Sequence, residues 1–562
     1  MNDAADRLPR VAYFSMEIAL DPAVPTYSGG LGVLAGDMLQ SAADLAVALI
    51  GVTLVSRQGY FRQEIAGGMQ VERPEPWEPA RFAEPVAAKV PLDMGGRRVW
   101  VGAWRYLVTS RSDGAPPVPV LLLDTDLPEN APEDRRLTDF LYGGDERYRL
   151  RQEMVLGIAG VRMLAALGVQ VTRYHLNEGH AALLALELLR MRCAAAQSPA
   201  APEALAAVRR QCVFTTHTPV PAGHDQFAYP LALAELGSMV QEPLLRTLAG
   251  DERLNMTRLA LSLSGWVNGV AQRHAETASG MFPGYTVHAI GNGVHPWTWA
   301  SDAHRLLYAR HVPHWCHEPE RLMMANRIAL PEIAAAHAAA KRLLLERAAE
   351  FPGGAALRPE RCTLGFARRM TAYKRPELLF ADLERLRRIA GRYPLQVLLA
   401  GKAHPHDLEG KREIERLLGF AQQLGAELPV VFLPGYGLEL ARLMVAGVDV
   451  WLNTPQRPLE ASGTSGMKAA LNGVPSLSVL DGWWIEGCAE GVTGWAVGGQ
   501  GPEDSGADAL SLYSKLEEQV LPLFYQRPAQ WTELTRSTIA HNGSFFNSHR
   551  MVRRYVLEAY AR

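Results

Sequence analysis

The segment from Glu460 to Gly473 brings an acid, hydroxyl side chains, glycines and a lysine together in one short stretch. An apolar run, Val448–Leu452, precedes it and predicts a strand, so we expect a loop that leads into a short helix around Lys468. The first N–H groups of a helix lack backbone partners and lie at the positive end of its dipole, so such a loop binds anions. A lysine one turn into the helix can lie beside a phosphate or form a Schiff base. A surface loop before a helix has the same glycine and serine pattern, which alone leaves both interpretations open.

The spacing of Glu460 and Lys468 also separates this segment from a known sugar-transfer motif. Retaining nucleotide-sugar transferases with two Rossmann-like domains carry Glu, seven residues and a second Glu, followed by Ala and Gly-x-Pro. Here Glu460 is followed by seven residues and then Lys468, with Gly473 and Pro475 beyond it. The lysine removes the acid that holds a nucleotide ribose in those enzymes. This difference argues against a nucleotide-sugar donor.

The run E-A-S-G-T-S-G-M-K-A-A-L-N-G closely resembles the pyridoxal-phosphate attachment segment of the α-glucan (glycogen, starch and maltodextrin) phosphorylases, in a short bacterial-type form. The resemblance implies pyridoxal 5'-phosphate as the cofactor, bound as a Schiff base at Lys468. Ser465-Gly466 stands where many members have Gly-Asn, a change that leaves the role of the lysine intact. The resemblance further implies that Thr464 and Ser465 contact the cofactor, and that glucose hydroxyls are held by Glu460, Ser462 and Gly463.

A group of cations follows another predicted strand further upstream, Cys362–Phe366: Arg368, Arg369, Lys374 and Arg375. A solvated basic face is the usual explanation of such a run, but Pro376 and the strand make it a turn. It resembles the family's K-R-x-x-x-Y-K-R segment. The resemblance implies that Arg369 and Lys374 bind the substrate phosphate and that Lys374 also contacts the cofactor phosphate. The resemblance also places Arg368 among the cofactor contacts; it replaces a lysine of many members, which keeps the charge and changes the hydrogen-bond geometry.

Two further turns of the second half resemble family segments. Pro434-Gly435-Tyr436-Gly437 resembles a turn near the cofactor, which places Tyr436 among the cofactor contacts. Lys402 follows the strand Leu395–Ala400 and either joins the phosphate cluster or only packs the strand end. Trp483 and Trp484 suit either sugar packing or a buried core.

The first half of the chain carries a glycine loop between a predicted strand, Val11–Phe14, and a predicted helix, Val33–Val47. A tight turn alone would explain these glycines. The loop resembles the N-G-G-L-G loop of the family, which implies that Gly30 donates a backbone N–H to the substrate phosphate and that Leu31 lies beside the sugar.

His217 directly follows the apolar strand Val213–Thr216 and lies in the run T-T-H-T. Ligands of open α/β sheets gather at the carboxyl ends of strands, although a packed histidine would fit equally well. The family's T-N-H-T stretch implies that His217 contacts the scissile glucosyl unit. His175, His180, His404 and His406 have no third ligand at a sensible spacing, so no metal is expected.

Strands and helices alternate in both halves, which predicts an α/β protein with parallel, doubly wound sheets. With the resemblance, this becomes two Rossmann-like domains facing across a cleft, the GT-B type of glycosyltransferase. A Pro-Gly-Gly run after an Ala-rich helix predicts the boundary. We expect an N-terminal domain, 1–355, a C-terminal domain, 356–540, and a terminal helix, 541–562, that crosses back.

The composition of the chain limits the classes of partner that it can bind. The 562 residues carry a net charge of −2 and a pI near 6.8, which does not suit nucleic acid. No apolar run is long enough for a membrane span, no signal peptide begins the chain, and five widely spaced cysteines suit free thiols, so we expect a cytoplasmic protein. The resemblance implies a homodimer as one oligomeric state. The chain is shorter than the muscle and plant members, so we expect little control by AMP or phosphorylation.

The implied reaction is phosphorolysis of α-1,4-glucans by inorganic phosphate, which releases α-D-glucose 1-phosphate from the non-reducing end with retention. In that scheme the cofactor phosphate acts as acid and base through the substrate phosphate, because a phosphate monoester titrates near pH 6. Two alternatives remain. One is a nucleotide-sugar-dependent retaining glucosyltransferase of the same fold. The other is a non-catalytic glucan-binding relative, which the joint presence of Arg369, Lys374 and Lys468 disfavours.

Overall fold

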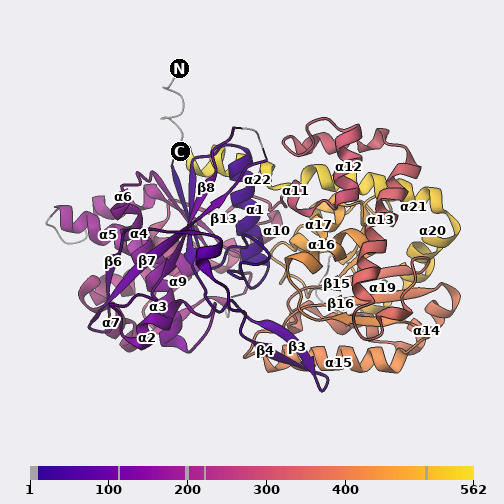
Figure 1. Ribbon diagram of the computed structural model, residues 1–562, viewed down its shortest axis with the longest axis horizontal. Coiled ribbons are helices and arrows are strands. Elements are labelled where there is room, and N and C mark those ends of the chain that lie inside the picture. The colour runs from indigo at the N-terminus through magenta and orange to yellow at the C-terminus, as the bar shows by residue number, and fades with distance from the viewer. Residues whose placement is uncertain are drawn as a thin grey trace. The chain divides into compact units, whose positions relative to one another are not determined.

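The computed structural model describes residues 10–111, 114–196, 202–220, 223–499, 501 and 504–561 (Figure 1). The chain folds into two compact units. The first takes in the chain up to Phe61, then Pro74–Ile290, and the chain from Met551 onward. The second takes in Arg62–Arg73 and Gly291–Arg550.

The first unit is built on a sheet with the strand order β14–β13–β10–β9–β1–β2–β8–β7–β5, and β6 also pairs with β7. The strands from β14 to β8 run parallel, and β7 is antiparallel to β8. Their bounds are β1 Val11–Ser15, β2 Leu49–Leu54, β5 Glu84–Pro85, β6 Val90–Met94, β7 Arg97–Val108, β8 Val118–Asp124, β9 Arg173–Asn177, β10 Cys212–Thr215, β13 Trp266–Gly269 and β14 His288–Ala289.

Strand β1 lies at the centre of this sheet and is buried on both faces. Ala12 and Phe14 pack into one hydrophobic core, whereas Val11 and Tyr13 pack into another, as the alternation of side chains along a strand requires. Helix α4, Gly160–Ala166, approaches so closely that a Cβ at Gly160 would lie 2.6 Å from the Phe14 ring. Such burial on both faces explains the continuous apolar run from which the strand was predicted.

The second unit contains a fully parallel sheet of order β17–β16–β15–β18–β19–β20. In chain order this is 3-2-1-4-5-6, the order of doubly wound nucleotide-binding sheets. The predicted fold class, α/β with two Rossmann-like domains of the GT-B type, is confirmed. The strand bounds are β15 Cys362–Ala367, β16 Leu395–Ala400, β17 Val430–Leu433, β18 Val450–Asn453, β19 Ser476–Val479 and β20 Gly494–Val497.

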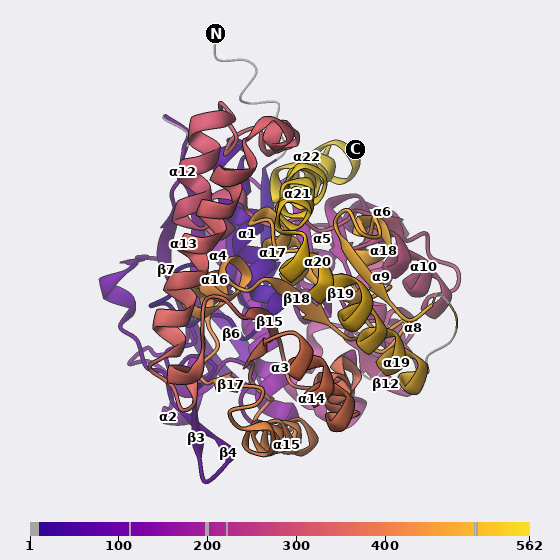
Figure 2. The same ribbon diagram turned by 90° about the vertical axis from the view of Figure 1, so that its right-hand side faces the viewer.

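The division between the units falls at 290/291, whereas the sequence placed the boundary at 355/356. Helix α13, Leu330–Ala348, packs against α16, Leu438–Gly447, so tightly that a Cβ at Gly447 would lie 2.7 Å from Leu344 (Figure 2). The Lys341 amine also lies 2.5 Å from the Asp449 carboxylate. The Pro-Gly-Gly run therefore forms a turn inside the second unit, not a linker between domains.

The two ends of the predicted terminal segment, 541–562, belong to different units. Residues up to Arg550 belong to the second unit, and the chain from Met551 onward belongs to the first. Within the first unit, Met551, Val552 and Tyr555 pack in the same core as Val11, and the Tyr560 hydroxyl lies 2.6 Å from His175 Nδ1.

A hairpin from the first third of the sequence belongs to the second unit. Its strands are β3, Arg62–Ala66, and β4, Met69–Arg73, and they lie beside α15, Leu408–Leu424 (Figure 1). The Lys411 amine of α15 forms an ion pair with Glu72 at 2.8 Å. The sequence analysis placed this hairpin, with the rest of residues 1–355, in the N-terminal domain, so its membership of the second unit was not predicted. In the described part of the chain, no helix is both long and apolar enough for a membrane span.

Candidate functional site

The second unit carries a charged cluster where β15 and β18 end. These neighbouring strands are the point at which the sheet order reverses, and ligands of doubly wound sheets bind at the carboxyl ends there. The Glu460 carboxylate accepts hydrogen bonds from Arg368 at 2.5 Å and from the Lys374 amine at 2.9 and 2.8 Å. Arg368 also donates to the Asn453 amide oxygen. The structure thus brings together three residues that sequence motifs had predicted separately.

The cluster is buried, with Lys374 and Glu460 only 7% and 6% exposed. Burial alone would raise the pKa of Glu460, but the charges of Arg368 and Lys374 outweigh it and lower this pKa to about 2. The Asp481 carboxylate accepts from the Glu460 backbone N–H at 2.9 Å, and burial raises the pKa of Asp481 to about 6. Arg368 and Lys374 thus stabilise the ionised form of Glu460, and the same two cations can also attract an anion bound beside them.

Unused hydrogen-bonding atoms lie in the same cluster. Arg368 Nε and Ser462 Oγ are buried and have no hydrogen-bond partner among the residues that the structure describes. Buried polar atoms usually have a partner, so these two are available to hydrogen-bond a ligand. Arg369 follows Arg368 directly after β15, and Tyr436 lies in the loop after β17.

Helix α17, Thr464–Leu471, places Lys468 one turn after its start. Gly463 precedes the helix in the left-handed conformation, with φ of 83°, so a side chain there would be strained. The Lys468 amine lies 3.8 Å from the centre of the Trp299 ring. Asn472 joins the two residues, because its amide donates to the carbonyls of Trp299 at 2.8 Å and Lys468 at 2.9 Å.

Trp299, Asn453 and Asp481 are members of this site that sequence reasoning missed. Nothing in the sequence spacing of Trp299 links it to Lys468. Asn453 carried a usable signal, since it is the first polar residue after the apolar run Val448–Leu452. Trp483 and Trp484 are 2% and 0% exposed, which identifies them as packing residues.

Arg375 does not join the cluster, although it stands next to Lys374. Its backbone is left-handed, with φ of 46°, and its guanidinium donates to the Asp508 carboxylate at 2.7 Å and to the Pro455 carbonyl at 2.8 Å. Through these contacts Arg375 holds the turn in place.

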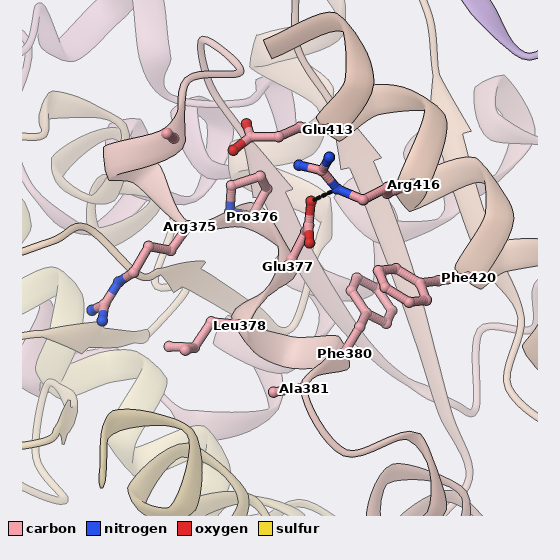
Figure 3. A pocket seen from close by; sticks show the side chains of 10 residues that line it. Arg375, Pro376, Glu377, Leu378, Phe380, Ala381, Glu413, Arg416 and Phe420 are labelled. Atoms are coloured by element: carbon pink, nitrogen blue, oxygen red, sulfur yellow. Dashed lines mark hydrogen bonds and ion pairs between the residues drawn. The ribbon is translucent and has the colours of Figure 1, made fainter. Parts of the chain in front are cut away.

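A separate pocket of about 350 Å³ lies between this turn and α15 (Figure 3). Phe380 and Phe420 stack along one wall with their ring centres 5.0 Å apart, and Arg416 pairs with Glu377. Glu413 is 5% exposed, and burial followed by the charge of Glu377 raises its pKa to about 7. The pocket is lined by Ala372, Arg375, Pro376, Glu377, Leu378, Phe380, Ala381, Glu413, Arg416 and Phe420, so it contains none of the residues predicted to bind cofactor or substrate.

The first unit has its own reversal of strand order, between β1 and β9. Glu17 follows β1 and accepts hydrogen bonds from the backbone N–H groups of Ser28 at 2.6 Å and Gly29 at 3.1 Å. The Tyr142 hydroxyl lies 2.8 Å from the same carboxylate. The glycine loop is thereby held so that α1, Gly30–Asp44, begins at Gly30, with Leu31 next to it. The helix start predicted at Val33 is three residues late.

His217 lies after β10 in the same unit. Its Nε2 lies 2.7 Å from the Asn177 side-chain oxygen, and its backbone N–H donates to Glu178 at 2.8 Å. Burial lowers the pKa of His217 to about 3, so the ring is uncharged near neutrality. Glu178 has a φ of 75°, a strained conformation for a residue with a side chain, of the kind found at functional sites.

The chain is similar in sequence to known proteins over the segments that carry these residues. The chain matches the carbohydrate phosphorylase family over residues 17–91 and 152–493. It is 37% identical to the maltodextrin phosphorylase of Thermococcus litoralis, over 98% of this chain and 70% of that protein. It is 36% identical to the glycogen phosphorylase of Mycobacterium tuberculosis, over 99% and 71%, and 34% identical to that of Aquifex aeolicus, over 98% and 86%.

Proposed function

Because the chain belongs to the carbohydrate phosphorylase family, it is a glycosyltransferase-type enzyme, and we propose that it phosphorolyses α-1,4-glucans. The products are α-D-glucose 1-phosphate, released from the non-reducing end with retention, and a glucan one unit shorter. The names of the relatives, maltodextrin and glycogen phosphorylase, support this substrate class. The observation that carries the proposal is the buried cluster of Arg368, Lys374 and Glu460 at the reversal of strand order.

Pyridoxal 5'-phosphate fits the residues around Lys468. The Lys468 amine would hold its aldehyde carbon, and the ring of Trp299 offers an aromatic face beside that amine. Thr464 and Ser465, in the first turn of α17, would donate hydrogen bonds to its phosphate. Arg368, Lys374 and Tyr436 would donate to the same phosphate, and the Arg368 Nε has no partner in the described chain. When bound, the cofactor supplies a phosphate that titrates near pH 6 and can exchange a proton with a neighbouring phosphate.

The other residues of the cluster bind and orient the substrates. Arg369 and Lys374 balance the charge of inorganic phosphate, and the Gly30 N–H donates to it, which is electrostatic preorganisation. Glu460, Ser462 and Gly463 accept from or donate to glucose hydroxyls. The ring of His217 contacts the scissile glucosyl unit as a neutral group, beside Leu31. The substrate phosphate gives a proton to the departing glycosidic oxygen as the bond from that oxygen to the anomeric carbon breaks, and phosphate then bonds to that carbon on the same face, which retains the configuration.

A nucleotide-sugar-dependent glucosyltransferase is the second candidate function. The fold and the cluster of cations would suit a diphosphate equally well. Lys468 stands where those enzymes have the acid for the ribose, and its amine lies over Trp299, so no acceptor is offered there.

The test uses purified protein reconstituted with pyridoxal phosphate. Maltodextrin is supplied with or without inorganic phosphate, and ADP-glucose or UDP-glucose is supplied in parallel reactions. We expect glucose 1-phosphate only when phosphate is present, and no turnover of either nucleotide sugar. Lys374→Ala should lower phosphorolysis at least 100-fold, whereas the surface variant Lys89→Ala should not. Nucleotide-sugar turnover without phosphorolysis would favour the second candidate, and glycogen binding without any product would favour a non-catalytic protein.

A further inference from the structure

The hairpin of β3 and β4, which belongs to the second unit, buries polar side chains where hydrophobic packing would require apolar ones. In each strand the only fully buried side chain is a glutamine: Gln63 is 4% exposed and Gln70 is 5% exposed. Met69, in contrast, is 55% exposed. Burying a polar amide is unfavourable unless its hydrogen bonds are met, so two buried amides in a solvent-facing hairpin indicate a specific role.

Both glutamines hydrogen-bond through their amides to loops of the Rossmann-like sheet, and Gln70 Nε2 also donates to Glu72 of the hairpin itself at 2.6 Å. The Gln70 amide makes a two-point contact with Ala403: its Nε2 donates to the Ala403 carbonyl and its Oε1 accepts from the Ala403 N–H, each at 2.9 Å. Gln63 Nε2 donates to the Gly401 carbonyl at 2.8 Å, and Gln63 Oε1 accepts from the Gly435 N–H at 3.0 Å. Gln63 Nε2 also donates to Gln70 Oε1 at 2.9 Å, which couples the pair.

The loop that the glutamines hold lies directly against the segment that carries Arg368 and Arg369. A Cβ at Gly401 would lie 1.9 Å from the Arg368 carbonyl oxygen. The Arg368 N–H donates to Ala400 at 3.2 Å, and the Met370 N–H donates to Lys402 at 3.0 Å, so backbone hydrogen bonds bracket Arg369 on both sides. Gly435 precedes Tyr436, the predicted cofactor contact in the next loop.

We propose that Gln63 and Gln70 are positioning residues for the anion-binding loops of the second unit. They set the backbone of 401–403, and through it the backbone of 368–370, so that Arg369 is oriented toward phosphate. This inference rests on the proposed function for the identity of the anion, but the holding of the loops does not. Amides suit this task because each carries both a donor and an acceptor and is uncharged at every accessible pH.

The test replaces each glutamine with methionine, which keeps the volume and removes the hydrogen bonds. Gln63→Met and Gln70→Met are made as separate single variants. If one of them fails to fold, the other still tests the proposal. Glu64→Gln is the matched control, because Glu64 lies on the same hairpin and pairs only with Arg62 and Arg73 in the described interactions. Hydrogen–deuterium exchange is followed without phosphate or cofactor, and the affinity of the unliganded protein for inorganic phosphate is measured by calorimetry.

We expect Gln70→Met to speed exchange in the peptides that contain Ala403 and 368–374, and Gln63→Met to do so in those that contain Gly435 and 368–374. We expect phosphate affinity and the phosphate KM to weaken about 5- to 10-fold, as for one or two lost hydrogen bonds, while the maltodextrin KM changes less than twofold. Unchanged exchange at 368–374, or an equal loss in both KM values, would overturn the proposal. If the wild-type protein neither binds nor uses phosphate, the proposed function fails, and exchange at 368–374 still decides whether the hairpin holds these loops.

Discussion

Glu460 is the counter-ion of two buried cations, and this role can be tested apart from catalysis. Glu460→Gln keeps the shape of the side chain and removes its charge, so Arg368 and Lys374 lose their ionised partner. A free anion should then be more stabilising at this place than in the wild type. We expect phosphate to raise the Tm of Glu460→Gln more than that of the wild type in a thermal titration. Phosphorolysis should fall by about 10- to 100-fold, because a hydrogen bond between charged and sugar groups is lost.

Glu517→Gln is the matched control, because Glu517 pairs with Arg385 in a partly exposed position of the same unit. Equal phosphate-induced shifts in Glu460→Gln and the wild type would contradict the counter-ion role.

His217 should act as an uncharged group throughout the working pH range. Burial places its pKa at about 3, so the ring gains no proton between pH 5.5 and 8. We therefore expect His217→Ala to lower kcat/KM by about 10-fold or more while the shape of the pH–rate profile is unchanged. The exposed His406→Ala serves as control and should alter neither. Loss of one limb of the profile in His217→Ala would show that the ring does titrate.

Motifs in the sequence were sufficient to nominate Arg368, Lys374 and Glu460, and the structure places these three in contact. Trp299 and Asp481 were not foreseen, because their relation to Lys468 and Glu460 arises from tertiary packing between distant segments. Local spacing carries no information about such contacts.

At the scale of elements, Glu413 links the stability of α15 to pH. Its pKa of about 7 exceeds the usual value near 4.5, so between these values the folded chain holds a proton that the unfolded chain releases. Stability from this group is therefore greatest at low pH and falls as the pH rises toward 7. Glu377, Glu409, Asp407 and Arg416 contribute the neighbouring charges.

Glu413→Gln stays neutral, so it should remove this loss of stability. We expect its Tm advantage over the wild type to be larger at pH 8 than at pH 5 by about 2 °C or more, as judged by scanning calorimetry. The same difference at both pH values would show that Glu413 ionises normally in the folded protein.

The alternating pattern of apolar runs predicted the parallel strands of both sheets, since strands buried on both faces are continuous hydrophobic segments, but not the antiparallel pairing of β5, β6 and β7 in the first sheet. It could not predict where the units divide. The Pro-Gly-Gly run is a local signal for a turn, whereas the division depends on the packing of α13 against α16 and on the pair of Lys341 with Asp449. The sequence also could not predict that β3 and β4 belong to the second unit, because the pattern of a hairpin does not show which unit it packs against.

At the scale of the whole molecule, the residues predicted to take part in the reaction are distributed over both units. Gly30 and His217 belong to the first unit, whereas Lys374, Glu460 and Lys468 belong to the second. The chain crosses between the units at 61/62, 73/74, 290/291 and 550/551. The account therefore predicts that activity is a property of the intact chain, with the cofactor attached at a single residue.

The most direct test compares the wild type, Lys468→Ala and the surface control Lys89→Ala, each incubated with pyridoxal phosphate and freed of excess. One sample of each is used for the near-ultraviolet and visible absorption spectrum and for phosphate-dependent release of glucose 1-phosphate from maltodextrin. We predict that the wild type and Lys89→Ala show the pyridoxal band and form product, and that Lys468→Ala does neither. A colourless wild type, or product formation that survives in Lys468→Ala, would contradict the account.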